Sequence, residues 1–323
     1  MKSFEYVNAK NINEAISSFN EYQGKAEYLA GGTDVIGVMK EQILSDYPLA
    51  IIDLKDIAPS MNYIKEEEGT LKIGATTSLY DISRHAAIND KYAALAEAAK
   101  STASPPLRFM GTIGGNICQE TRCWYYRAPQ NYFDCLKKNQ QGLCYALIGD
   151  SRYHSIFSAT NGCVCVNPSD IAPALVAFNA NVVTNKRAIP IGEFFDVVVA
   201  PKKSSMTVLE EGEIVTEIQI QTPVSGTKSH FVKFALRKSI DFPIANCAVV
   251  IGGGEASICL NAVSGKPRKV TAAEELIAGK DINEENAEAA AVAAVKGAVP
   301  IGNNKYKIQI AKTLVKRTIL ACK

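Results

Sequence analysis

The sequence has no run of apolar residues that approaches the roughly 18 needed to span a bilayer. It also lacks a basic stripe, and its net charge is only +2 over 323 residues, which argues against nucleic acid as a partner. Its first residues mix polar and apolar side chains, without the apolar core of a signal peptide. We therefore expect a cytoplasmic protein with no membrane partner, in a compartment where thiols stay reduced.

Two common nucleotide-binding signatures are missing as well, since neither GxGxxG nor a P-loop occurs. The sequence also shows no internal repeat or low-complexity tract. Apolar residues make up 47% and charged residues 21%, as in an ordinary soluble globular protein. The length is sufficient for two or three domains. Segments typical of strands and helices alternate through the first half, which indicates an α/β or α+β arrangement there.

Local signals predict where several elements begin. Asn11 is the expected N-cap of a helix over residues 12–22, and Thr77 or Ser78 is expected to start another helix. The turn-rich segment 223–228 predicts a domain boundary. Beyond that segment, alternating strand patterns give way to helical ones.

Two glycine turns have the character of phosphate-binding turns. The first, Gly31-Gly32-Thr33, lies between an expected strand and a helix that Thr33 or Asp34 would cap, and the second spans Gly111–Asn116. Backbone amides at a helix N-terminus attract anions, and glycine lets the backbone approach a pyrophosphate closely. Each turn alone is explained equally well as a simple helix cap. Together they suggest a two-sided clamp for a large dinucleotide.

Cysteine, in contrast, is abundant, because six of the nine cysteines fall between Cys118 and Cys165. An odd number of cysteines in an intracellular chain points to a metal centre and away from disulfides. Iron–sulfur irons and zinc both take thiolate ligands, usually four per site. The spacings here are 11, 8 and 18 intervening residues instead of CxxC, and the segment is rich in aromatic side chains that suit a shielding shell. The cysteines with these spacings are Cys123, Cys135, Cys144 and Cys163.

The remaining candidates have simpler explanations. Cys118 follows the second glycine turn and is expected to pack, whereas Cys165 alternates with valines and suits either the core or ligation. Cys247 and Cys259 lie in apolar strand patterns and are interpreted as small buried hydrophobes. His154 competes as a ligand, although a single histidine in a loop is more often hydrogen-bonded or exposed.

Four motifs together resemble one family. They are LAGGTDV at 29–35, TIGGNICQ at 112–119, SDIAPAL at 169–175 and RKSIDFP at 237–243. Their order and spacing are similar to those of the flavin-binding (medium) subunit of molybdenum hydroxylases, a family that includes xanthine dehydrogenases, carbon monoxide dehydrogenases and 4-hydroxybenzoyl-CoA reductase. The resemblance runs along the whole chain. It implies an α+β fold, with a two-part FAD-binding module and a C-terminal domain of antiparallel strands packed on helices.

The resemblance and the turn-rich segment also imply domain limits. The FAD-binding region is expected over 1–222, in subdomains 1–55 and 56–222, with a cysteine-rich insert at 118–165. The C-terminal domain is expected over 223–323.

The resemblance further implies which residues hold FAD. Asp170 is expected to bond a ribose hydroxyl or to stabilise the 116–119 turn, and Lys233 to approach the isoalloxazine ring. No residue of this chain is expected to act on the substrate. The implied FAD-binding residues are Tyr28, Leu29, Ala30, Gly31, Gly32, Thr33, Asp34, Val35, Thr112, Gly114, Gly115, Asn116, Asp170 and Lys233.

Within the family, the cysteine insert is similar to that of the 4-hydroxybenzoyl-CoA reductase β subunit, which carries a [4Fe–4S] cluster. Glu120-Thr121-Arg122-Cys123 and Cys135-Leu136-Lys137 match its pattern. The fourth ligand is expected seven residues before the aspartate of the SD motif, at Cys163 instead of Cys165. The interval from Cys144 to Cys163 is longer than in that pattern, and the interval from Cys123 to Cys135 is shorter.

The function implied is that of an electron-transfer flavoprotein subunit of a molybdopterin-dependent oxidoreductase. Electrons would pass between an external carrier, expected to be ferredoxin at the [4Fe–4S] cluster, and [2Fe–2S] clusters of a small partner subunit. A large partner subunit would hold the molybdopterin, and the insert alone suggests an enzyme like 4-hydroxybenzoyl-CoA reductase.

Two alternatives remain at this point. One is an NAD-linked flavin subunit of a xanthine or carbon monoxide dehydrogenase-like enzyme, whose insert binds zinc or nothing. The other is a zinc-stabilised scaffold in which the glycine turns only cap helices.

Overall fold

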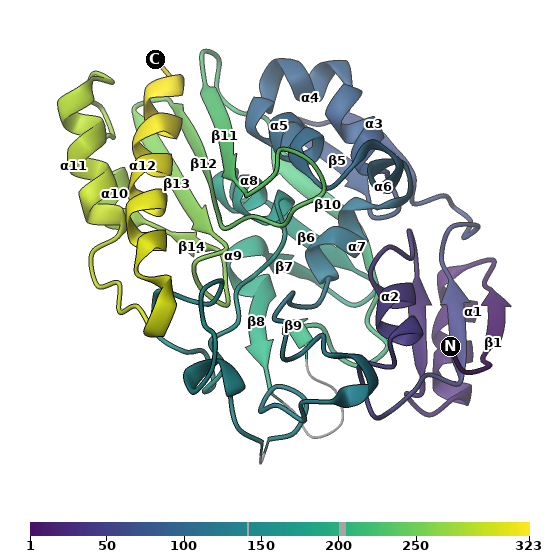
Figure 1. The fold of residues 1–323 in the computed structure, drawn as a ribbon. Helices are drawn as coiled ribbons and strands as arrows, with labels where there is room; N and C mark the ends of the chain where they lie inside the picture. Colours follow the sequence, from purple (N-terminus) through teal and green to yellow (C-terminus); the bar gives the residue numbers. More distant parts are fainter. Residues whose placement is uncertain (141, 200–204) are drawn as a thin grey trace.

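The computed structural model describes residues 1–140, 142–199 and 205–323, and it shows separate sheets with helices packed on them (Figure 1). The mixture of antiparallel sheets, a small parallel sheet and helices confirms the α+β class. In this part of the chain, no helix is both long and apolar enough to cross a membrane.

The N-terminal part is a small parallel sheet with strand order β1-β3-β2. Asn11 caps the first helix as expected, since its side chain accepts a hydrogen bond from the amide of Glu14 at 2.9 Å. The apolar face of this helix, including Ala15 and Phe19, packs on buried Ile52 of the central strand. The elements are β1 (Glu5–Asn8), α1 (Ile12–Glu21), β2 (Ala26–Leu29), α2 (Val35–Lys40) and β3 (Ala50–Asp53).

The middle part is an antiparallel sheet with strand order β4-β5-β10-β6-β7. Its central strand β10 pairs with β5, although most of the middle part lies between them in sequence. The chain leaves this sheet after β5, passes through several helices and the cysteine insert, and returns. Ser78 caps α3, as the sequence predicts.

The strands of this sheet are β4 (Ile64–Glu67), β5 (Thr70–Gly74), β6 (Asn181–Thr184), β7 (Ala188–Pro190) and β10 (Val215–Gln221), and a separate ribbon consists of β8 (Phe195–Val198) and β9 (Ser205–Thr207). The helices are α3 (Leu79–Arg84), α4 (Ala86–Lys91), α5 (Ala93–Ser101), α6 (Pro105–Met110), α7 (Ile113–Cys118), α8 (Ile171–Ala177) and α9 (Ile191–Phe194).

The C-terminal part is an antiparallel sheet, β11-β12-β13-β14, covered by α10, α11 and α12 (Figure 1). Buried alanines of α11 pack against α12 and the sheet in one apolar core. This matches the expected domain of strands packed on helices. The elements are β11 (Lys228–Phe234), β12 (Ala245–Gly252), β13 (Glu255–Asn261), β14 (Arg268–Lys269), α10 (Thr271–Glu274), α11 (Glu284–Ala294) and α12 (Tyr306–Ala321).

The cysteine insert has little regular structure, with only two short 3-10 turns, Pro129–Asn131 and Tyr145–Leu147, among its described residues. It is tied to both ends of the molecule. The amide of Gln130 donates to the carbonyl of Glu41 at 2.8 Å, and Ser151 Oγ donates to the carbonyl of Ile301 at 2.7 Å. The insert therefore connects the N-terminal sheet with the C-terminal part.

Candidate functional site

The two glycine turns are in direct contact. A Cβ added at Gly31 would lie 2.0 Å from the carbonyl oxygen of Met110 and 2.9 Å from Cα of Gly111. A Cβ added at Gly111 would lie 3.7 Å from Thr33 Oγ1. Only glycine at position 31 allows the two backbones to approach this closely. The structure thus brings together the two turns that the sequence separates by some 80 residues.

The turns differ in how their amides are used. No hydrogen bond from the backbone amides of Gly31, Gly32, Thr33 or Asp34 to another described residue is found. Gly32 has a φ of 71°, which favours glycine. The first turn therefore has unbonded amides available for an anion.

Most amides of the second turn already donate hydrogen bonds within the protein. Gly114 donates to the carbonyl of Ala75 at 2.9 Å, and Gly115 donates to Thr112 Oγ1, which caps α7, at 3.1 Å. The amides of Gly114 and Gly115 therefore hold α7 against β5 and cap the helix, whereas the amide of Thr112 makes no hydrogen bond with another described residue. The second turn instead supplies the wall on which the first turn packs.

Asp34, one of the two residues expected to cap α2, takes the N-cap position, but its carboxylate turns toward the insert and makes no cap hydrogen bond. Its Oδ1 lies 2.6 Å from Nη1 of Arg122 and 2.7 Å from Nη2 of Arg127, and its Oδ2 accepts from the amide of Glu120 at 2.9 Å. Burial alone would raise the pKa of Asp34, but the two guanidiniums outweigh it and hold this pKa below its ordinary value. Ion pairs therefore connect the first glycine turn with the start of the cysteine insert.

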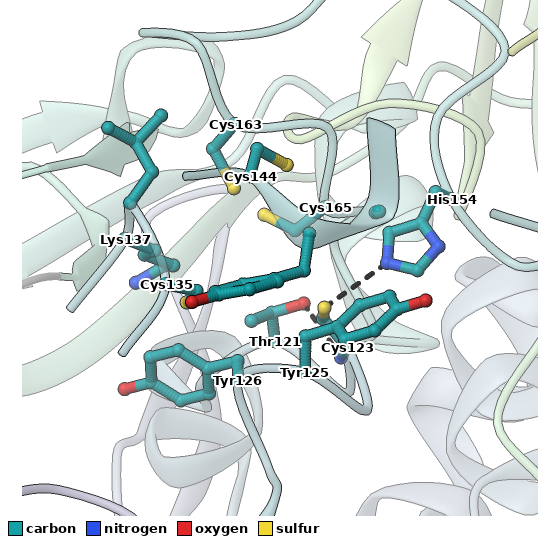
Figure 2. Close-up of a pocket in the computed structure, with 13 residues that line it drawn as sticks. Thr121, Cys123, Tyr125, Tyr126, Cys135, Lys137, Cys144, His154, Cys163 and Cys165 are labelled. Carbon is teal, nitrogen blue, oxygen red and sulfur yellow. Dashed lines mark hydrogen bonds between the residues drawn. The ribbon is translucent and has the colours of Figure 1, made fainter. Parts of the chain in front are cut away.

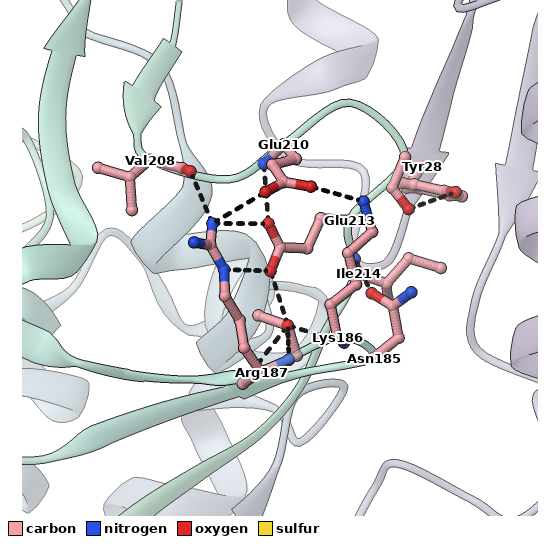
Figure 3. Close-up of polar contacts among 10 residues, drawn as sticks. Tyr28, Asn185, Lys186, Arg187, Val208, Glu210, Glu213 and Ile214 are labelled. Atoms are coloured by element: carbon pink, nitrogen blue, oxygen red, sulfur yellow. Dashed lines mark hydrogen bonds and ion pairs between the residues drawn. The ribbon is translucent and has the colours of Figure 1, made fainter.

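The side chain of Tyr28 packs against the apolar core of the N-terminal part. Its ring stacks on Phe19 with centroids 5.2 Å apart, and its hydroxyl donates to the carbonyl of Gly212 at 3.3 Å. Gly212 lies in the loop before β10. Arg187 holds this loop in place, because its Nε lies 3.1 Å from Oε1 of Glu213 (Figure 3). The backbone of Tyr28 continues through the half-buried Leu29 and Ala30 into the first glycine turn. Val35 follows the turn as the first residue of α2.

Asp170 and Lys233 lie together as a buried pair, 2.6 Å apart. Lys233 also donates to the carbonyl of Ser101 at 3.2 Å, and Asn246 Nδ2 donates to the second oxygen of Asp170 at 2.8 Å. Burial raises the pKa of Asp170, against the opposing effect of Lys233. Lys233 is thus not a solvated strand-edge lysine, and it bonds a carboxylate from a motif far away in sequence.

The turn at Asn116 is stabilised by Ser169 instead of Asp170. Ser169 Oγ donates to Asn116 Oδ1 at 2.5 Å, and Asn261 Nδ2 donates to the carbonyl of Ser169 at 2.7 Å. These roles of Ser169, Asn246 and Asn261 were not predicted from the sequence. The two asparagines could have been recognised as partners of buried polar groups, because each is a polar side chain at a buried position of an apolar strand pattern.

The four predicted cysteine ligands line a single cavity of about 20 Å³ (Figure 2). Room for roughly one water molecule remains there. Among the described residues, no three potential ligand side chains converge closely enough to hold a metal ion as they stand. The cavity is lined by Thr121, Cys123, Tyr125, Tyr126, Cys135, Leu136, Lys137, Cys144, Tyr145, Ala146, His154, Cys163 and Cys165.

Hydrogen-bond donors surround the cavity sulfurs. Burial raises the pKa of Cys123 to about 12, and the amides of Tyr126 and Tyr125 act in the opposite direction by donating to its sulfur. A hydrogen bond with Cys163 is the main cause that raises the pKa of Cys144, whose sulfur also receives amide bonds. Without a bound cation these groups are thiols, because burial and the contact between the sulfurs disfavour the thiolate more than the amide donors favour it.

His154 and Cys165 also reach this cavity. His154 Nε2 lies 3.1 Å from the sulfur of Cys123 (Figure 2), and burial, followed by the charge of Lys307, lowers the pKa of His154 to about 4. The sulfur of Cys165 contacts the sulfur of Met206 at 3.8 Å. Lys137, the last residue of the Cys135-Leu136-Lys137 motif, is buried and pairs with Glu120 at 2.8 Å.

The other cysteines are explained by packing. Cys118 contacts the central core, and burial raises the pKa of its thiol to about 12. Cys247 and Cys259 are fully buried in β12 and β13, as the strand pattern predicts.

Comparisons with known proteins identify the family of this chain. The family described as "FAD binding domain in molybdopterin dehydrogenase" matches residues 2–223, and the "CO dehydrogenase flavoprotein C-terminal domain" matches residues 230–322. The aldehyde oxidoreductase FAD-binding subunit PaoB of Escherichia coli is 29% identical, over 97% of this chain and 96% of its own length. The carbon monoxide dehydrogenase medium chain of Hydrogenophaga pseudoflava is 28% identical, over 98% and 96%.

A solved structure of the Hydrogenophaga pseudoflava carbon monoxide dehydrogenase superposes with a TM-score of 0.76 at 28% identity, covering 99% of this chain and 97% of the matched one. The chain therefore belongs to the family of FAD-binding subunits of molybdenum hydroxylases, as its four motifs indicate, and it is a flavoprotein subunit of the oxidoreductase class.

Proposed function

We propose that this chain is the FAD-carrying electron-transfer subunit of a molybdopterin-dependent oxidoreductase, assembled with a small [2Fe–2S] subunit and a large molybdopterin subunit. Family membership supports the flavin, and the relatives named as medium chains support an assembly of several chains. The observation that carries the proposal is the first glycine turn, whose unbonded amides lie against the second turn. Such a turn suits a pyrophosphate.

The residues present fit FAD. The amides from Gly31 to Asp34 would hold the pyrophosphate, and Thr112, Gly114, Gly115 and Asn116 would form the opposite wall. Lys233, held by Asp170, would lie toward the electron-rich part of the flavin and favour negative charge there. A bound flavin supplies the chemistry of accepting two electrons together and releasing them singly.

We further propose a [4Fe–4S] cluster on the insert, held by Cys123, Cys135, Cys144 and Cys163. Three features support it: four thiols line one cavity, amides donate to their sulfurs, and aromatic rings surround them. Thiolates with such hydrogen bonds are the donor set of iron–sulfur proteins. Because the cavity is only about 20 Å³, the loops that carry the cysteines must open around a cluster.

The motif similarity of the insert to that of the 4-hydroxybenzoyl-CoA reductase β subunit supports a related enzyme, with ferredoxin as the external carrier at the insert. We also propose the domain limits that the sequence predicts. The FAD-binding region spans 1–222 and is divided after residue 55, and the C-terminal domain spans 223–323.

The small cavity favours one competing possibility, an insert that binds a single zinc ion in an NAD-linked flavin subunit. Zinc takes four thiolates and needs less space than four irons and four sulfides. The amide donors around the sulfurs suit either metal.

Sedimentation of this chain with its two partner subunits tests the assembly. A stable complex that contains all three chains and flavin is expected. Separate sedimentation of fully folded, flavin-loaded subunits would refute the proposed assembly.

A further inference from the structure

The segment 208–214, which we call the bracing loop, connects β9 with β10 and contacts the N-terminal part of the chain (Figure 3). Ile214 is 2% exposed and belongs to the apolar core of that part. Gly212 accepts the hydrogen bond of the Tyr28 hydroxyl, and a Cβ added at Gly212 would lie 3.2 Å from the ring of Phe19. The loop is therefore packed into the N-terminal part, although it precedes a strand of the middle sheet.

The other side of the bracing loop is fixed to the turn between β6 and β7 (Figure 3). The side chain of Glu213 is fully buried, and its carboxylate accepts two hydrogen bonds from Arg187, each 3.1 Å long, and one from the Thr184 hydroxyl at 2.7 Å. Asn185 and Ile214 bond each other twice, at 3.0 and 2.8 Å. A buried carboxylate with a two-pronged arginine partner holds one loop conformation strongly.

The bracing loop leads to both glycine turns. On one side it bonds Tyr28 of β2, and Gly31 follows three residues later. On the other side it continues directly into β10, where the carbonyl of Thr216 accepts from the amide of Ala75 at 2.9 Å. The carbonyl of Ala75 in turn accepts from the amide of Gly114, in the second turn, at 2.9 Å. A short series of bonds thus runs from this loop to each wall of the cleft.

We propose that the ion pair of Glu213 and Arg187 sets the spacing of the two glycine turns through the bracing loop, and so determines how tightly the apoprotein binds FAD. This inference rests on the proposed FAD site at the turns. Neither residue belongs to a turn, so both are positioning residues. Without the pair the loop can move, and the fraction of molecules with aligned turns falls. The apparent affinity for FAD falls by the same fraction.

The test compares Glu213→Gln, which keeps the shape and removes the charge, with Arg187→Gln and with the conservative Arg187→Lys. Glu274→Gln is the matched control, because Glu274 is also a buried carboxylate and accepts from the amide of Ile258 at 2.8 Å in the C-terminal part. Each full-length apoprotein is titrated with FAD, and its unfolding midpoint in urea is measured without FAD. The second measurement separates cleft geometry from general stability.

We expect the two glutamine variants of the pair to bind FAD about 2- to 30-fold more weakly than the wild type. Arg187→Lys should lie between them and the wild type. Glu274→Gln should keep the wild-type affinity although its unfolding midpoint also falls.

Equal FAD affinities in the wild type and both glutamine variants of the pair would overturn the inference. An equal loss of affinity in Glu274→Gln would also overturn it, because affinity would then follow general stability. If Glu213→Gln does not fold, Arg187→Gln decides, since the Arg187 side chain is 43% exposed. A folded wild-type apoprotein that does not bind FAD would instead refute the proposed FAD site.

Discussion

The carboxylate of Asp34 lies 2.6 Å from the guanidinium of Arg122, the residue immediately before Cys123. Asp34 follows the first glycine turn, so a single ion pair joins the proposed flavin site to the first proposed cluster ligand. Arg122 also stacks on Phe242 of the RKSIDFP motif, with its guanidinium carbon 4.5 Å from the ring centroid. Three motifs that are far apart in sequence meet at this pair.

Asp34→Asn should therefore weaken both sites. Two largely buried guanidiniums would lose their counter-charge, at a cost of about 3 kcal/mol. We expect lower flavin and iron contents in the same preparation, measured by absorbance and metal analysis. Glu288→Gln, which removes a carboxylate that pairs with Lys312 elsewhere, is the control and should leave both contents unchanged. A loss of iron with normal flavin would show that the pair does not couple the sites.

Gly31→Ala should expel FAD. The added Cβ would lie 2.0 Å from the Met110 carbonyl oxygen and force the two turns apart. Overpacking of this kind costs about 1–3 kcal/mol, so flavin affinity should fall roughly 5- to 150-fold. Gly37→Ala on α2, where a Cβ meets nothing within 4 Å, is the matched control. Flavin titration of the apoproteins measures the difference, and equal affinities would rule out this turn as the cradle.

The two neighbouring cysteines should respond differently to serine. Cys163 makes hydrogen bonds with both Cys144 and Cys165, and the sulfur of Cys165 also contacts the sulfur of Met206. Cys163→Ser should reduce the iron content strongly while FAD stays bound, and Cys165→Ser should retain iron. Iron and acid-labile sulfide assays measure this. The opposite pattern would make Cys165 the fourth ligand.

Lys307 predicts a pH dependence of stability. Burial lowers its pKa in the folded protein from 10.5 to about 7. Between these values the unfolded chain binds a proton that the folded protein does not, so this lysine makes folding more favourable as the pH rises from about 7 to 10.5. The melting temperature of the wild type relative to Lys307→Met should therefore rise across this range. A constant difference would show that Lys307 stays charged in the fold.

The sequence predicted those features that depend on neighbouring residues. Asn11 and Ser78 cap their helices because a short side chain can reach an amide three residues on. The glycine turns were recognisable because glycine, a strand before it and a helix after it are adjacent in sequence.

Contacts between distant segments were not predictable in this way. Nothing local to Lys233 indicates that its partner is Asp170, 63 residues away, and the charge of a lysine alone suggested solvent. The insert has no periodic pattern, so the contact of His154 with Cys123 depends on loops whose path is fixed by α12 and β13. The motif resemblance supplied the cofactor residues, but it could not tell which amides of the two turns are free.

The central claim is that one chain holds a flavin at its glycine turns and iron at its insert. The most direct test is the FAD, iron, zinc and acid-labile sulfide content of the chain purified without oxygen. We expect about one FAD, four irons and four sulfides per chain, without zinc. Flavin with stoichiometric zinc, or flavin with no metal after anaerobic supply of iron and sulfide, would contradict this claim.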